Sequence, residues 1–124
     1  MNRDCGPTNE IAGNPWYFPP ETIRGDGTAG DPRIDVYGLG LVLYVALTNE
    51  RPYSAQPAIK LLEQILSVAP KGPRRIVRSV PAALEAICLK AMAKDPHQRY
   101  ATAAELAAAL RSFLAPRRRM GFWK

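Results

Sequence analysis

The chain has 124 residues, of which 47% are hydrophobic and 23% are charged, a composition that indicates one small globular domain and argues against extensive disorder. The formal net charge is +6, but residues 1–62 carry five basic and seven acidic residues, whereas residues 63–124 carry twelve and four. This uneven charge is not that of a uniformly basic nucleic-acid-binding surface, so no nucleic-acid partner is expected.

Cysteine and histidine content excludes two further classes of protein. Cys5 and Cys88 are too few for a disulfide scaffold, and a structural zinc site is not expected with His97 as the single histidine and no CxxC pair. The first 20 residues lack the apolar core of a signal peptide, and the longest apolar run, residues 39–47, is too short to cross a bilayer. We therefore expect a cytoplasmic chain without a bound metal.

The expected elements follow one another in a simple order. Residues 1–33 are rich in glycine and proline, which predicts loops. Residues 34–49 carry apolar side chains on every side of a helix and predict the most buried helix of the chain; a buried strand is the alternative, but the length favours a helix. Residues 57–68 and the segment that begins at Pro81 have the spacing of amphipathic helices, and a basic connector, residues 69–80, separates them.

The last expected helix begins at a capping box. Thr102 and Glu105 have the spacing at which each side chain caps a backbone N–H of the first helical turn. Pro116 is expected to end this helix and to begin a basic tail, which is either solvated or in contact with a membrane surface. No segment predicts a strand convincingly, so the expected fold class is all-α.

Few residues have the pattern of a catalytic or phosphate-binding site. Residues 25–30 fit G-x-G-x-x-G, but no strand precedes them and Asp31-Pro32 follows, so a surface loop is the better interpretation. His97 has no nucleophilic partner in a recognisable motif, and Cys88 lies in an apolar helix that does not favour a reactive thiolate. No catalytic residue is predicted in this chain.

Four stretches, in the same order, resemble the second half of a serine/threonine protein kinase domain. Gly13–Glu21 resembles the G-T-P-x-Y-M-A-P-E end of the activation segment. Asp35–Gly40 resembles the start of the central helix of the family, and Leu41–Pro52 resembles its continuation. Lys94–Tyr100 resembles K-D-P-x-x-R-Y, and the helices on either side of that motif are similar to those of bacterial, Hanks-type members.

The resemblance covers about residues 8–115 and implies three parts. Residues 1–21 would be the end of the activation segment with the substrate-docking loop, residues 22–115 the helical part of the kinase C-lobe, and residues 116–124 a basic tail. The family reaction is transfer of the ATP γ-phosphate to a protein Ser or Thr. The 124 residues contain neither the phosphate-binding lysine motif, nor His-Arg-Asp, nor Asp-Phe-Gly, so ATP and Mg²⁺ are expected only in a complete family domain and the chain alone is expected to be inactive.

The partner implied by the resemblance is a protein substrate or the remainder of a kinase domain. A membrane would be involved only if the full protein continued into a transmembrane helix. The alternative function is a stand-alone helical module, derived from a kinase, that binds proteins.

The resemblance also implies roles for residues near the N-terminus. The substrate-docking loop would consist of Gly13, Asn14, Pro15, Trp16 and Tyr17. Asn14 stands where the family has a threonine whose hydroxyl contacts the catalytic groups, a departure that weakens the expectation of catalysis. Thr8 is a possible phosphorylation site, although an ordinary loop threonine is the more common case.

Three further residues would have structural roles by the same resemblance. Glu21 would pair with Arg99 in a buried bidentate ion pair, whose planar geometry suits arginine rather than lysine; a solvated charge is the alternative for Arg99. Asp35 would accept hydrogen bonds from the backbone of the catalytic loop, or would simply favour the dipole at the start of its helix.

Overall fold

The computed structural model describes residues 18–26, 30–54 and 56–120 of the chain. Within these ranges the fold is all-α and contains no strand, as the sequence predicts. The elements, in chain order, are α2 (Pro20–Arg24), α3 (Pro32–Thr48), α4 (Ala58–Ser67), α5 (Pro73–Ile76), α6 (Ala82–Ala91), the 3₁₀ turn η3 (Pro96–Gln98) and α7 (Ala103–Met120).

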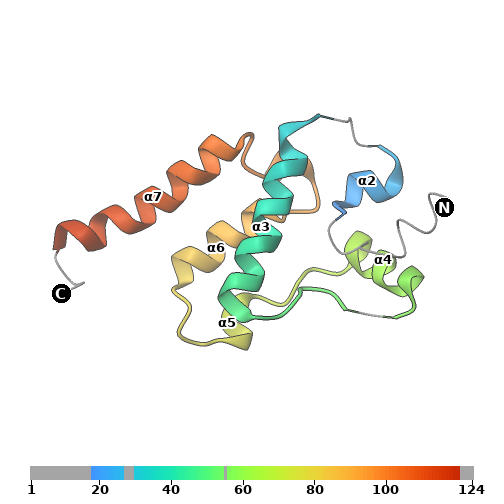
Figure 1. The fold of residues 1–124 in the computed structure, drawn as a ribbon, viewed down its shortest axis with the longest axis horizontal. Coiled ribbons are helices and arrows are strands. Elements are labelled where there is room, and N and C mark those ends of the chain that lie inside the picture. Colours follow the sequence, from blue (N-terminus) through green and yellow to red (C-terminus); the bar gives the residue numbers. More distant parts are fainter. Residues whose placement is uncertain (1–17, 27–29, 55, 121–124) are drawn as a thin grey trace, which may run out of the picture.

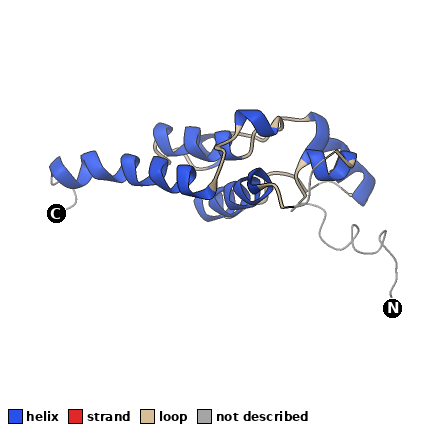
Figure 2. Cartoon of the chain, turned by 90° about the horizontal axis from the view of Figure 1, so that it is seen from above, coloured by secondary structure: helices blue, strands red, loops and turns tan. Residues whose placement is uncertain are grey.

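Helix α3 lies at the centre of the molecule and packs against α5, α6 and α7 (Figure 1). Helix α7 extends from one end, and α2 and α4 lie in contact at the other. Figure 2 shows that the helices form an elongated arrangement rather than a sphere.

The core has two clusters, one on each of two sides of α3. The larger joins α3, α4 and α6 and consists of Tyr37, Leu41, Tyr44, Tyr53, Leu61, Ile65, Cys88 and Met92. The smaller joins α3, α6 and α7 and consists of Val36, Ala91 and Leu106, with Ile87, Tyr100 and Leu110 packed against it. Burial of these apolar surfaces, rather than helix propensity, holds the short helices in place.

Helix α3 has more buried residues than any other described helix, but it is not buried on all sides. Leu39 is 45% exposed and Val42 is 58% exposed, whereas Leu41 is fully buried. Asp35 and Ala46 are also exposed, and the four positions lie at helical spacing on one stripe of α3. The prediction that this helix is the most buried of the chain is therefore confirmed among the described helices, although no described element covers this stripe.

The N-terminal region contains more helix than its glycine and proline content predicts. Helix α2 begins at Pro20 and ends where Gly25 takes a left-handed conformation, with φ of 81°. Proline at the first helical position and glycine beyond the last are ordinary helix boundary signals, but five residues are too few to show a periodic pattern. Helix α3 also begins at Pro32, because the side chain of Asp31 caps it by accepting from the Arg33 N–H at 2.9 Å.

The predicted end of the last helix was wrong. Helix α7 begins after Thr102 and continues through Pro116 to Met120, so residues 116–120 do not form a separate tail. Proline fits the helical φ and removes one hydrogen bond with the preceding turn, which makes it unfavourable there but does not forbid continuation. The capping box forms in part, because Thr102 Oγ1 accepts from the Glu105 N–H at 3.2 Å and Glu105 Oε1 accepts from the Ala101 N–H, one residue earlier than expected. Within the described ranges, no helix is long and apolar enough to cross a membrane.

Candidate functional site

Two short elements, far apart in the sequence, bring Glu21 and Arg99 together. Glu21 lies in the first turn of α2 and is buried against the rest of the molecule. Arg99 follows η3, a turn that Asp95 caps by accepting from the His97 N–H at 2.9 Å. This hydrogen bond, with a second contact to the His97 ring, lowers the pKa of Asp95, so its capping carboxylate stays ionised.

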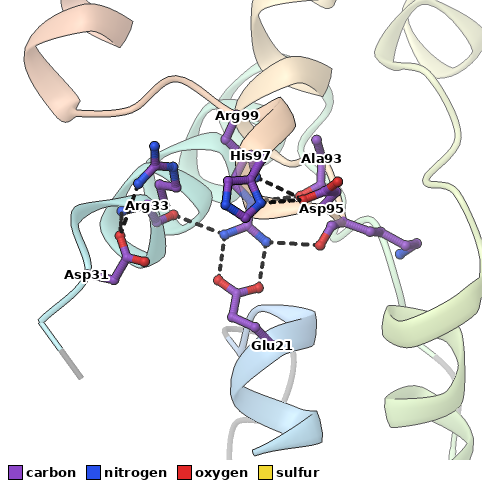
Figure 3. Close-up of polar contacts among 8 residues, drawn as sticks. Glu21, Asp31, Arg33, Ala93, Asp95, His97 and Arg99 are labelled. Carbon is purple, nitrogen blue, oxygen red and sulfur yellow. Dashed lines mark hydrogen bonds and ion pairs between the residues drawn. The ribbon is translucent and has the colours of Figure 1, made fainter. Parts of the chain in front are cut away.

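The predicted ion pair is bidentate and shielded from solvent (Figure 3). Arg99 Nη1 donates to Glu21 Oε2 at 2.6 Å, and Arg99 Nη2 donates to Glu21 Oε1 at 2.7 Å. The side chains are 0% and 8% exposed, respectively. Charge-assisted bonds in this parallel geometry are stronger and more directional than bonds between neutral groups.

The remaining donors of Arg99 connect the pair to two other segments. Arg99 Nε donates to the Ala93 carbonyl at 2.7 Å, and Nη1 also donates to the Arg33 carbonyl at 3.1 Å. The guanidinium lies over the ring of Tyr37, 4.9 Å from its centroid, and burial raises the pKa of this tyrosine to about 12. One cation therefore holds α2, the start of α3 and the segment after α6 in a single arrangement.

Asp35 lies in the first turn of α3 and is exposed. It makes no hydrogen bond or ion pair with other described residues, because Asp31 takes the capping position. The carboxylate therefore remains free to accept hydrogen bonds from another backbone, beside the exposed side chain of Leu39 one turn further along.

The other predicted site residues lie outside the described residues. These are the substrate-docking loop, Gly13 to Tyr17, and the possible phosphorylation site Thr8. Their roles stay predictions from the sequence.

Lys94 has a structural role that the sequence did not reveal. Its Nζ donates to Tyr53 Oη at 2.9 Å and to the Ile65 carbonyl, and it lies 4.9 Å from the centroid of the Tyr53 ring. No carboxylate in the described ranges pairs with it, and burial, together with the nearby charge of Arg24, lowers its pKa to about 8. Lys94 belongs to the K-D-P motif recognised in the sequence. The partners of its side chain lie in distant segments, which no local pattern indicates.

Two observations concern the phosphate-loop pattern and metal ligands among the described residues. Gly25, the first glycine of the G-x-G-x-x-G pattern, ends α2 instead of joining a strand to a helix. The described ranges also contain no group of three or more His, Cys, Asp or Glu side chains that could hold a metal ion.

Comparison with known proteins identifies the family of this chain. Residues 2–110 match the protein kinase domain family. The chain is 42% identical over 108 residues to the tyrosine-protein kinase MasK of Myxococcus xanthus and 41% identical over 103 residues to the serine/threonine-protein kinase PknB of Mycobacterium tuberculosis. A probable serine/threonine-protein kinase PknB of Bifidobacterium longum is 39% identical over 95 residues.

These matches cover most of the chain but little of the relatives. They span 87%, 83% and 77% of this chain, respectively, and 16%, 16% and 14% of the three proteins. The chain belongs to the protein kinase domain family, and it resembles the bacterial, Hanks-type members in the part of the domain that begins within the activation segment.

Proposed function

We propose that this chain forms the helical, substrate-facing part of a kinase domain that transfers the ATP γ-phosphate to Ser or Thr of a protein. In this proposal the groups that bind ATP and Mg²⁺ come from other polypeptide sequence, and the 124 residues alone are inactive. The proposal goes beyond family membership, because the matched relatives include kinases named for tyrosine and for serine/threonine.

The observation that carries the proposal is the uncovered stripe of α3. An exposed carboxylate, Asp35, precedes two large exposed apolar side chains, Leu39 and Val42, on the helix that otherwise forms the centre of the core. A polypeptide that packed on this stripe would bury apolar surface and offer backbone N–H groups to Asp35. The catalytic loop of a kinase has the chemistry to do both, which favours the role of Asp35 as its anchor.

The Glu21–Arg99 pair supports the same proposal. It holds α2, which directly follows the substrate-docking loop, against the segments around Arg33 and Ala93. A rigidly held α2 would keep the docking loop in one position relative to the rest of the domain, and positioning accounts for much of the catalysis in phosphoryl transfer.

A chimeric kinase tests the proposal. In PknB of M. tuberculosis, the segment that this chain matches would be replaced by the corresponding residues of this chain, and transfer of radiolabelled phosphate to a protein substrate would be measured. We expect activity that phosphoamino acid analysis assigns to serine and threonine. We also expect Asn14→Thr to raise that activity, because it restores the hydroxyl that the family pattern has at this position.

Two variants on α3 separate this function from a purely structural role. Val42→Ser should lower the activity of the chimera and leave the stability of the isolated chain almost unchanged, because Val42 is 58% exposed. Leu41→Ser should destabilise both proteins, because Leu41 is fully buried. A folded chimera without activity, even with Asn14→Thr, would contradict the proposal and favour the stand-alone binding module.

A further inference from the structure

A pocket of about 460 Å³ lies between the segment after α3, the end of α4 and the connector that leads into α5. Its lining is apolar at Tyr53, Val68 and Pro70, neutral polar at Ser54 and Gln64, and cationic at Lys71 and Arg75. No Asp or Glu is among the described residues that line it. An apolar base with a basic rim can accept an apolar side chain that has anionic neighbours.

Two tyrosines of the core hold the connector that forms one wall of this pocket. Tyr53 Oη donates to the Val68 carbonyl at 2.6 Å, and Tyr44 Oη donates to the Lys71 carbonyl at 2.6 Å. Both tyrosine side chains are buried, and Pro70 further restricts the backbone between the two fixed carbonyls. The wall is thus formed before a ligand arrives, which reduces the ordering cost of binding.

No ion pair within the described part of the chain neutralises the positive charge of Lys71 and Arg75, which line the pocket, or of Arg74 and Arg78, which lie beside them in the sequence. All four residues are exposed. The carboxylate of Glu85 contacts this segment through the backbone, because it accepts from the Arg74 N–H at 2.9 Å. Four unpaired cations in eight residues attract an anionic partner.

We propose that this basic pocket, defined by Tyr53, Val68, Pro70, Lys71 and Arg75, binds an acidic peptide segment of another protein. An apolar side chain of the peptide packs on Tyr53, Val68 and Pro70, and flanking carboxylates contact Lys71 and Arg75. A concave apolar base suits a peptide side chain better than a nucleic acid, whose affinity depends mainly on the number of phosphates neutralised. This binding does not depend on ATP or on the proposed kinase activity.

Fluorescence anisotropy with a labelled peptide tests this proposal on the 124-residue chain. The probe is an Asp/Glu-rich heptapeptide with one central leucine, and we expect saturable binding that weakens as salt is added. Arg75→Gln and Lys71→Gln should each weaken binding about two- to fivefold, the range for one exposed ion pair. Arg111→Gln, the same charge change on the exposed side of α7, is the matched control and should have no effect.

Further outcomes would overturn the proposal. One is the absence of saturable binding to a chain that circular dichroism shows to be helical. If Arg111→Gln weakened binding as much as Arg75→Gln, the net charge of the chain alone would explain the affinity. If a peptide with serine in place of leucine bound equally well, no apolar side chain would pack on Tyr53, Val68 and Pro70. Tighter binding of a single-stranded oligonucleotide of the same charge would indicate a nucleic-acid site instead. Arg75→Glu provides a second variant, which should weaken binding more than Arg75→Gln without unfolding the chain, because Arg75 is exposed; an effect no larger than that of Arg75→Gln would contradict a direct contact with peptide carboxylates.

Discussion

The side chain of Arg99 makes more hydrogen bonds than that of any other charged residue discussed above. Its guanidinium is fully buried and bonds to both oxygens of Glu21 and to the Ala93 and Arg33 carbonyls. A buried charge with every donor satisfied adds little net stability compared with an apolar replacement, but it specifies one geometry. We therefore expect the pair to serve mainly to position α2.

Removal of one partner from the pair should be costly. We expect Glu21→Gln to lower the free energy of unfolding by about 3–5 kcal/mol, because it leaves the Arg99 cation buried without a counter-charge. Urea denaturation at neutral pH measures this loss. The matched control is Asp26→Asn in the exposed pair with Arg24, where the two groups are 3.6 Å apart and the expected loss is below about 1 kcal/mol.

The double variant Glu21→Leu/Arg99→Met completes this test. It should lose less stability than the sum of the two single variants, because no charge then remains buried alone. Additive losses, or a loss from Glu21→Gln as small as that of the control, would contradict a coupled buried pair.

Lys94 should make stability depend on pH in the alkaline range. Its pKa is lowered to about 8 in the folded chain from the ordinary value of 10.5, so the unfolded chain binds more protons between these two values. Stability therefore rises with pH from about 8 toward 10.5, and the penalty of the buried charge is fully present below about 8.

The difference between wild type and Lys94→Met isolates this effect. Urea denaturation from pH 7 to 9 should show a free energy of unfolding that increases relative to Lys94→Met as pH rises. This range avoids most of the opposite contribution of Cys88, whose pKa burial raises from 9.0 to about 12. Lys60→Met, at an exposed position of α4, should show no such difference. A flat difference over this range would contradict the assignment.

At the scale of elements, the contact between α3 and α6 depends on Gly40. A Cβ atom at this position would lie 2.8 Å from Met92 Cγ and 2.9 Å from Ala91 Cβ, which is closer than atoms in a relaxed core approach. The Cys88 thiol also lies close to the Gly40 carbonyl, at 3.6 Å. The two helices can approach this closely only because glycine has no side chain.

Two glycines of the same helix provide a matched pair of variants. We expect Gly40→Ala to lower the free energy of unfolding by about 1–3 kcal/mol through overpacking. Gly38→Ala should instead raise it by up to about 1 kcal/mol, because no atom outside the neighbouring residues and the backbone of its own helix lies within 4 Å of the added methyl, and alanine has the higher helix propensity. Urea denaturation of both variants gives the comparison, and equal shifts of the same sign would contradict close packing of α3 on α6.

At the scale of the whole molecule, the described helices share a core that leaves one stripe of α3 exposed. Two apolar clusters hold α3, α4, α6 and α7 together, and the stripe of Asp35, Leu39 and Val42 remains uncovered. In the proposed function, further polypeptide of the kinase domain would cover this stripe.

The isolated chain should therefore fail to bind ATP. We expect no saturable binding when a fluorescent ATP analogue is titrated into the chain with Mg²⁺, because none of the motifs that hold nucleotide and metal occurs in its 124 residues. The active chimera described above is the positive control. Micromolar binding that unlabelled ATP displaces would contradict this expectation.

Local patterns in the sequence were sufficient to predict most of the helices and the protein family. The spacing of apolar residues in 57–68 and after Pro81 predicted α4 and α6, because a helix repeats every 3.6 residues wherever it packs. The Pro-Pro-Glu and Lys-Asp-Pro-x-x-Arg motifs indicated the Glu21–Arg99 pair through their resemblance to kinases, and the structure forms that pair.

Only the tertiary structure decided the features that depend on contacts between distant segments. The partners of Lys94 and the wall of the basic pocket join residues far apart in the sequence. The stripe of α3 is local, but its exposure depends on which other segments pack around the helix. Helix α7 continues through Pro116 although proline usually ends a helix, so this local rule gave the wrong helix end. Burial and hydrogen-bond partners are properties of the folded chain, so composition and spacing alone could not reveal them.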